Sequence, residues 1–187
     1  MENIYIALLH YPVYNKKGDV VTTAVTNMDV HDISRSARTY GVKRFYIVTP
    51  IKEQKELVER IIRHWQKGYG ASYNPLRKEA FDIIDLESTL YNVLKNISAE
   101  SGRKVKLVVT GAGFRKKLIK FTELKKKIAE NTDSYLLAFG TGWGIVEKAI
   151  DNADFFLEPI KGSSNYNHLS VRSAVAIVLD RLLGERS

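Results

Sequence analysis

The sequence predicts an α/β fold in which a mostly parallel sheet carries helices on both of its faces. Short apolar runs of strand length alternate with amphipathic stretches of helix length along the 187 residues. Residues 3–9, NIYIALL, are the first such run, and residues 22–50 continue as loop, helix, turn and strand. Strand, helix and strand in this order form a βαβ unit, and such units build parallel sheets with buried strands.

A single domain is expected over residues 1–187. A chain of this length buries about 70% of its unfolded surface as one domain, and two full domains would be cramped. The composition, 44% apolar and 27% charged, is that of a soluble globular protein. No internal repeat or low-complexity linker divides the chain.

The first helix is expected to begin with Asp29 or Asp32 as its cap, to run to about Tyr40 and to end at Gly41. Positions three apart lie near one another on a helix, so one polar face should gather two carboxylates and two guanidiniums. These belong to Asp29, Asp32, Arg35 and Arg38. The alternative is a solvated face with local ion pairs.

The middle of the chain is predicted to alternate helix, loop and strand. Residues 51–67 have apolar side chains at helical spacing and predict a mostly core-facing helix that ends at Gly68. Residues 68–81 predict a loop in which aromatic rings accompany Arg77 and Lys78. Such rings could stack on unpaired bases, although a packed loop is the commoner explanation.

Two more helices are expected before the C-terminal region. FDIID, residues 81–85, predicts a short strand, after which Asp85 would cap a helix over residues 86–99. KVKLVV, residues 104–109, predicts a strand that ends in the small-residue turn TGAG. FTELKKKIAEN then predicts an amphipathic helix capped by Thr122.

The last fifty residues hold two loops that each lead into a helix. The run from Tyr135 to Phe139 predicts a buried strand that enters FGTGWGI, whose glycines let backbone approach a ligand closely. Residues 155–159, FFLEP, predict a second strand that Pro159 ends. Ser170 is then expected to cap a helix over residues 171–183.

Charge and composition narrow the possible partners. The net charge is +8, and part of the excess is clustered between residues 103 and 127, which favours a polyanion. Without cysteine there is no thiol nucleophile or zinc-thiolate site, and the four histidines show no ligand spacing, so no metal is expected. The sequence contains no apolar run of about 18 residues, and the N-terminus lacks signal-peptide features. A cytoplasmic location with no membrane association is therefore expected.

The loops resemble the SPOUT superfamily of S-adenosylmethionine-dependent RNA methyltransferases, whose C-terminal chain forms a trefoil knot. The resemblance lies in FGTGWGI, EPIKG and NHLSVRSA in that order, and in the spacing of Asp29, Arg35 and Gly41. It implies a knotted cofactor-binding region over about 135–187. General topological rules alone would not predict a knot.

The resemblance implies that S-adenosyl-L-methionine lies among three turns, 110–113, 139–144 and 158–162. Leu169 and Ser170 would close the pocket. The implied cofactor-binding residues are Thr110, Gly111, Phe139, Gly140, Thr141, Gly142, Trp143, Gly144, Glu158, Pro159, Ile160, Gly162, Leu169 and Ser170. Glycines allow main-chain amides to reach a ligand.

The same resemblance suggests catalytic residues. Arg35 is the first choice for positioning a phosphate or the acceptor nucleotide, since a guanidinium binds two oxygens at once. Proton removal falls to Asp29, Asp32 or His168. His168 stands where ribose-methylating relatives usually have Asn, and GTGWG lacks their Glu, so methylation of a base in tRNA or rRNA is favoured. The turn is closer to the branch resembling the tRNA guanine-N1 methyltransferase catalytic domain.

Members of this family are homodimers, and the final helix often lies at their interface. Its apolar row could serve as core or as interface: Val171, Ala174, Val175, Val178, Leu179 and Leu182. Two other readings remain open: a non-catalytic RNA-binding or assembly module on the same fold, and an unrelated α/β protein that binds a small molecule.

Overall fold

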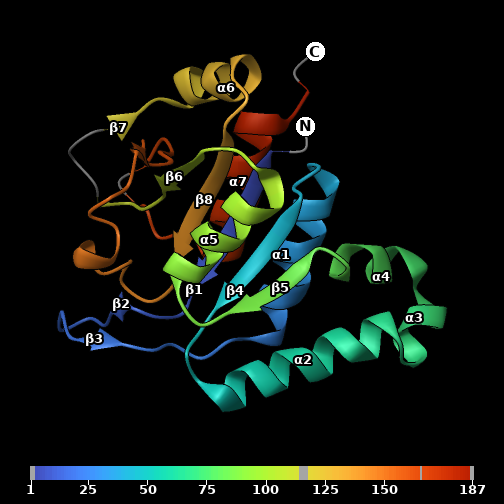
Figure 1. The fold of residues 1–187 in the computed structure, drawn as a ribbon. Coiled ribbons are helices and arrows are strands. Elements are labelled where there is room, and N and C mark those ends of the chain that lie inside the picture. Colours follow the sequence, from blue (N-terminus) through green and yellow to red (C-terminus); the bar gives the residue numbers. More distant parts are fainter. Residues whose placement is uncertain (1–2, 114–117, 165, 186–187) are drawn as a thin grey trace.

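The computed structural model describes residues 3–113, 118–164 and 166–185, which are built on a seven-stranded sheet (Figure 1). The strand order is β5-β4-β1-β8-β6-β9-β7, and the six neighbouring pairs are all parallel. The strands are β1 (Ile4–Leu9), β4 (Arg44–Val48), β5 (Ile84–Glu87), β6 (Val105–Val109), β7 (Leu118–Ile119), β8 (Ser134–Gly140) and β9 (Phe155–Leu157). The predicted α/β fold with a mostly parallel sheet is confirmed.

Helices cover both faces of the sheet, as predicted. Alternate residues of β1 point to opposite faces, so Ile4 and Ile6 belong to one apolar cluster and Tyr5 and Ala7 to the other. The first cluster is covered by α1 (Asn27–Thr39), α6 (Phe121–Glu130) and α7 (Val171–Leu183), and the second by α5 (Leu90–Ser101) and the short 3₁₀ helix η1 (Glu147–Ala149). Figure 1 shows α5 in front of the sheet and α1 and α7 behind it.

Two insertions extend the βα pattern. The short hairpin of β2 (Val13–Tyr14) and β3 (Val20–Val21) separates β1 from α1. Between β4 and β5 the chain forms α2 (Lys52–Gln66), α3 (Tyr69–Tyr73) and α4 (Pro75–Phe81), which we call the helical arm. Figure 1 shows the arm beside α1, at the lower right.

The helical arm differs from the predictions in two ways. α2 forms where expected, and its Ile61, Ile62 and Trp65 pack against the core as predicted. Val58 is its one fully buried residue, and Leu57, which was expected to face the core, is 39% exposed. Residues 68–81 are two short helices and not a loop. The second of these is specified by Asn74, whose side chain accepts from the backbone N–H of Arg77, and by Pro75 in the first turn.

Three predicted helix caps are corrected by the structure. α1 is capped by Thr26, whose hydroxyl oxygen accepts from the backbone N–H of Asp29 at 3.1 Å, so neither Asp29 nor Asp32 is the cap. Asp85 lies inside β5, and Thr89 caps α5 instead. The hydroxyl of Thr89 accepts from the N–H of Asn92, a bond that Asp85 is too far upstream to make.

Of the two C-terminal helices, α6 differs from its predicted cap and α7 agrees with it. α6 starts after Lys120, which provides no side-chain cap, and Thr122 lies within the helix. The first N–H of α6 is satisfied by a distant carboxylate, that of Glu158, at 2.8 Å from the nitrogen of Phe121. α7 spans residues 171–183 as predicted, and Ser170 caps it by accepting from the N–H of Ser173.

Most of the apolar row on α7 serves as core. Val175, Val178, Leu179 and Leu182 are at most 2% exposed in the single chain, whereas Val171 and Ala174 are half-buried. Among the described residues, none of the helices combines the length and the apolar character that a bilayer crossing requires.

Candidate functional site

Three turns lie at the carboxyl ends of neighbouring strands. β6 pairs with β8 on one side and with β9 on the other, and Val109 stands opposite both Ala138 and Phe156. The turns that follow these strands, 110–113, 140–144 and 158–162, therefore leave the sheet at the same edge. Open α/β sheets bind their ligands at this edge.

The glycines of the 140–144 turn serve the packing of the protein itself. Gly142 and Gly144 have φ values of +58° and +106°, which side-chain-bearing residues rarely adopt. A Cβ atom on Gly140 would lie 2.6 Å from Cγ1 of Ile145, and one on Gly142 would lie 2.8 Å from the carbonyl oxygen of Tyr14. These glycines thus let the turn fit against its own chain and the β2–β3 hairpin.

A chain of polar side chains ties this turn to the end of β1. The Thr141 hydroxyl donates to the carbonyl of Leu9 at 3.0 Å and also contacts the hydroxyl of Thr23 at 2.5 Å. Thr23 in turn lies 3.1 Å from Nδ1 of His10, which is fully buried. Burial lowers the pKa of His10 from 6.5 to about 4, against an opposing effect of Asp29. His10 is therefore neutral at pH 7.

Several side chains at the other two turns form contacts within the protein. The hydroxyl of Thr110 donates to the carbonyl of Ala138 at 3.0 Å. The carboxylate of Glu158 accepts from the backbone of α6, as described above, and Ile160 packs against the core. Gly111 and Gly162 are exposed, and a Cβ atom on Gly162 would meet nothing within 4 Å. The accessible polar atoms here are thus backbone groups and the exposed side chain of Lys161.

Exposed aromatic rings stand next to the 140–144 turn. The ring of His168 lies 6.0 Å from the ring of Trp143 and 6.0 Å from that of Tyr166. Trp143, Tyr166 and Leu169 are 57%, 75% and 46% exposed, so apolar surface faces solvent at this edge. The sequence analysis did not single out Tyr166.

The predicted polar face of α1 is divided between different partners. Asp29 and Asp32 both pair with Arg172 of α7, at 3.5 and 3.0 Å. Asp29 is 8% exposed and also accepts from the hydroxyl of Thr26 at 2.6 Å. The expected grouping of two carboxylates with two guanidiniums of α1 is therefore wrong. Arg172 was missed, although it lies in NHLSVRSA.

Arg35 and Arg38 behave differently from each other. Arg38 pairs with Glu79 of α4. The Arg35 side chain is exposed, and its guanidinium forms no hydrogen bond or ion pair within residues 3–113, 118–164 and 166–185. A guanidinium in this state is available for a phosphate.

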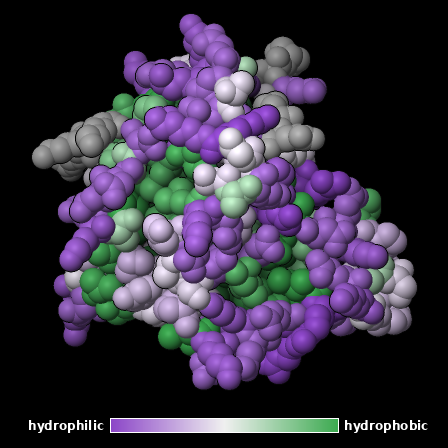
Figure 2. Space-filling view, in the orientation of Figure 1, coloured by the Kyte–Doolittle hydropathy of each residue, from purple (hydrophilic) through white to green (hydrophobic). Residues whose placement is uncertain are grey.

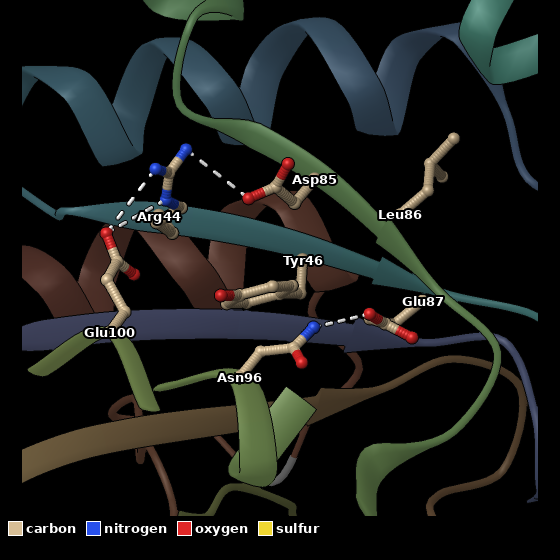
Figure 3. Close-up of a pocket in the computed structure, with 7 residues that line it drawn as sticks. All are labelled: Arg44, Tyr46, Asp85, Leu86, Glu87, Asn96 and Glu100. Carbon is tan, nitrogen blue, oxygen red and sulfur yellow. Dashed lines mark hydrogen bonds and ion pairs between the residues drawn. The ribbon is translucent and has the colours of Figure 1, made fainter. Parts of the chain in front are cut away.

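A cavity of about 330 Å³ lies away from the turns, at the β5 edge of the sheet (Figure 3). Arg44 is one of its lining residues and pairs with Asp85 at 3.3 Å and with Glu100 at 3.4 Å. Its other lining residues are Tyr46, Leu86, Glu87 and Asn96. The cavity is lined from β4 and β5, and β1 and β8 separate it from β6 and the turn that follows, so it is not the predicted cofactor site. No cluster of three metal-ligating side chains occurs in the described part of the chain.

Comparison with known sequences identifies the class of protein to which this fold and site belong. A model of a SAM-dependent RNA methyltransferase family matches residues 3–184. The chain belongs to this family, and S-adenosylmethionine is the family's cofactor, so the resemblance to RNA methyltransferases is confirmed.

Relatives and solved structures agree with this assignment. An uncharacterised protein of Aquifex aeolicus is 43% identical, over 97% of this chain and 88% of its own length. A tRNA (guanine-N(1)-)-methyltransferase of Oleidesulfovibrio alaskensis is 38% identical, over 98% of this chain. A SpoU methyltransferase from Streptomyces viridochromogenes, solved with AdoMet, has a similar fold, with a TM-score of 0.60 and 14% identity over 98% of this chain and 58% of that one.

Coverage limits what the named relatives imply. The chain spans 42% of the length of the Oleidesulfovibrio protein, and 42% of a second tRNA (guanine-N(1)-)-methyltransferase, from Nitratidesulfovibrio vulgaris, that is 38% identical. More than half of each enzyme thus lies outside the match. Its name describes the whole protein, so guanine-N1 specificity does not follow for this chain.

The buried His10 makes stability depend on pH. In the unfolded chain it binds a proton below about pH 6.5, whereas in the folded protein it does so only near pH 4. The contribution of neutral His10 to the free energy of unfolding is complete above pH 6.5. As the pH falls toward 4, about 3 kcal/mol of this stability is lost. Urea unfolding of the wild type between pH 7 and pH 4 should show this loss, and His10→Asn should flatten it. Equal slopes in both proteins would contradict the assignment.

Proposed function

We propose that the chain is an active S-adenosylmethionine-dependent methyltransferase that modifies a base in tRNA or rRNA. The observation that carries the proposal is the convergence of three turns at one sheet edge in a chain matched by the family model from residue 3 to residue 184. A non-catalytic RNA-binding or assembly module is the second candidate. It is favoured by the relatives' length, which leaves room for a separate catalytic domain.

The three turns fit a cofactor held mainly through backbone groups. Four of the exposed residues in the turns are glycines, Gly111, Gly113, Gly142 and Gly162, and the side chains of Thr110, Glu158 and Phe139 are engaged or buried. The other exposed turn residues are Ala112, Trp143 and Lys161. We assign adenine recognition to main-chain groups of 110–113, 140–144 and 158–162. Leu169 and Ser170 would close the pocket, with Pro159 and Ile160 shaping its wall.

The protein's part in the reaction is alignment and proton removal. S-adenosylmethionine supplies an activated methyl group, which the acceptor atom attacks in line as the sulfur departs. Arg35 holds a phosphate of the RNA beside this centre. Asp29 is nearly buried and accepts from Thr26, whereas Asp32 and His168 are exposed, so we assign proton removal to Asp32 or His168.

A trefoil knot in about 135–187 is part of the proposal. β9 lies beyond β6 in the sheet, yet α7 packs against α1 and α6. The segment after β9 must therefore return past the carboxyl ends of β6 and β8. At the far end, the ammonium of Lys125 donates to the carbonyl of Gly184 at 3.0 Å, which holds α7 beside α6. A tRNA or rRNA substrate also supports a cytoplasmic location.

We further propose a symmetric homodimer, because the exposed apolar side chains of Trp143, Tyr166 and Leu169 stand beside the 140–144 turn. A second copy covering this edge would complete the pocket. Light scattering should give twice the chain mass of 21.2 kDa. A monomer of full activity at high dilution would refute the dimer.

Arg35→Ala tests the catalytic assignment. We expect methyl transfer to RNA to fall by about 100-fold or more, because the acceptor is no longer aligned. Calorimetry should show unchanged binding of S-adenosylhomocysteine. Arg38→Ala removes the same charge one turn away and should keep nearly full activity. If the wild type binds neither S-adenosylmethionine nor S-adenosylhomocysteine, the enzyme assignment is lost.

A further inference from the structure

A second cavity lies between α1 and the helical arm, and the mechanism above does not use it. It has a volume of about 480 Å³. Asn27 and His31 of α1 line one side, and Arg60, Ile61, His64 and Trp65 of α2 line the other. We call this space the arm cleft.

Aromatic rings form much of the arm cleft. The indole of Trp65 lies 5.3 Å from the ring of His31 and 5.0 Å from that of His64, edge to face in both cases. Arg77 stacks on the indole at 4.6 Å. A Cβ atom on Gly70 would lie 2.6 Å from the indole, so this glycine lets α3 pack closely on Trp65. The indole is thereby fixed while remaining only half-buried.

The arm carries positive charge that the protein does not neutralise. Residues 52–81 contain seven Lys and Arg against four Glu. Within the described ranges, six of these cations form no ion pair. Lys55 donates to the Ser88 hydroxyl and Arg77 stacks on Trp65, which leaves Arg60, Arg63, Lys67 and Lys78. Figure 2 shows hydrophilic side chains along the lower edge, where α2 runs. Of the four, Arg60 lines the cleft.

The arm cleft lies next to the proposed methylation site. Arg35 is one turn beyond His31 on α1, so the two side chains share a face of the helix. At the other end, Asn27 is four residues from Thr23, which contacts the 140–144 turn. Burial, followed by the charge of Arg77, lowers the pKa of His31. A neutral imidazole and the Asn27 amide can both donate and accept hydrogen bonds.

We propose that the arm cleft binds an unpaired nucleotide of the RNA substrate, with its base against Trp65 and His64 and its phosphate on Arg60. This combination of ring faces, amide and unpaired cation suits a single-stranded nucleotide. A base within a duplex is stacked on its neighbours and cannot enter. The proposal rests on the proposed function only in taking RNA as the substrate.

Intrinsic fluorescence tests this proposal directly. The chain has two tryptophans and ten tyrosines, so Trp143→Phe leaves Trp65 as the one tryptophan, and excitation at wavelengths that tyrosine does not absorb selects it. Titration with a single-stranded oligoribonucleotide should quench Trp65, and the same strand annealed to its complement should quench it far less. Absence of quenching by the single strand, at concentrations where it binds, would overturn the proposal.

Matched variants separate base binding from general attraction. Arg60→Ala and His64→Ala should each weaken single-strand binding by about tenfold, the effect of losing one stacking or phosphate contact. Arg63→Ala removes an equal charge from the same helix outside the cleft and should weaken binding by less than about threefold. Equal losses for Arg60→Ala and Arg63→Ala would leave only non-specific attraction and contradict the proposal.

The experiment also distinguishes this proposal from the proposed function. Arg60→Ala should raise the KM for RNA while kcat and S-adenosylhomocysteine binding stay unchanged. If the Arg60→Ala variant methylates RNA with an unaltered KM, the proposed function stands and the arm-cleft proposal is contradicted. If the protein binds no cofactor but single strands still quench Trp65, the enzyme assignment is contradicted and the arm-cleft proposal stands.

Discussion

The parallel pairing of β8 with β1 and β6 is the constraint on which the rest of the structure depends. The first six residues of β8 are buried, and β1 pairs with it from Ile4 opposite Tyr135 to Leu9 opposite Gly140. A shift of one residue would exchange the side chains of β8 between the two apolar clusters, moving Tyr135 and Leu137 to the face that now holds Leu136 and Ala138. The register therefore fixes where the 140–144 turn leaves the sheet. Because β6 and β9 follow in parallel, the same constraint gathers the other two turns.

Polar side-chain contacts hold the turns and helices in the positions that the sheet gives them. Thr141 and Thr23 join the turn to the hairpin, and Arg172 joins α7 to two carboxylates of α1. Asp29 is nearly buried, so removal of its partner would leave a carboxylate poorly solvated. Both links join segments more than 100 residues apart, Thr23 with Thr141 and α1 with α7. The site is thus held by elements far apart in sequence.

Much of the fold could be predicted from local pattern, and the errors have physical causes. The runs at 4–9 and 134–140 are apolar because parallel strands are buried on both faces, and Ser170 is recognisable as a cap from its type and position. Strand order and the pairing of Arg172 depend on contacts between distant residues, which spacing does not encode. Thr26 and Thr89 were overlooked because nearby aspartates also make good caps. The glycines of GTGWG were predicted to let backbone approach a ligand, whereas Cβ atoms on Gly140 and Gly142 would meet atoms of the protein itself.

Hydrogen–deuterium exchange with and without S-adenosylhomocysteine is the most direct test of the claim that the three turns form one cofactor site. The account predicts that backbone amides in 110–113, 140–144 and 158–162 gain protection together, while the Arg44–Glu100 cavity at the β5 edge does not change. Protection confined to that cavity, or to only one of the turns, would contradict it.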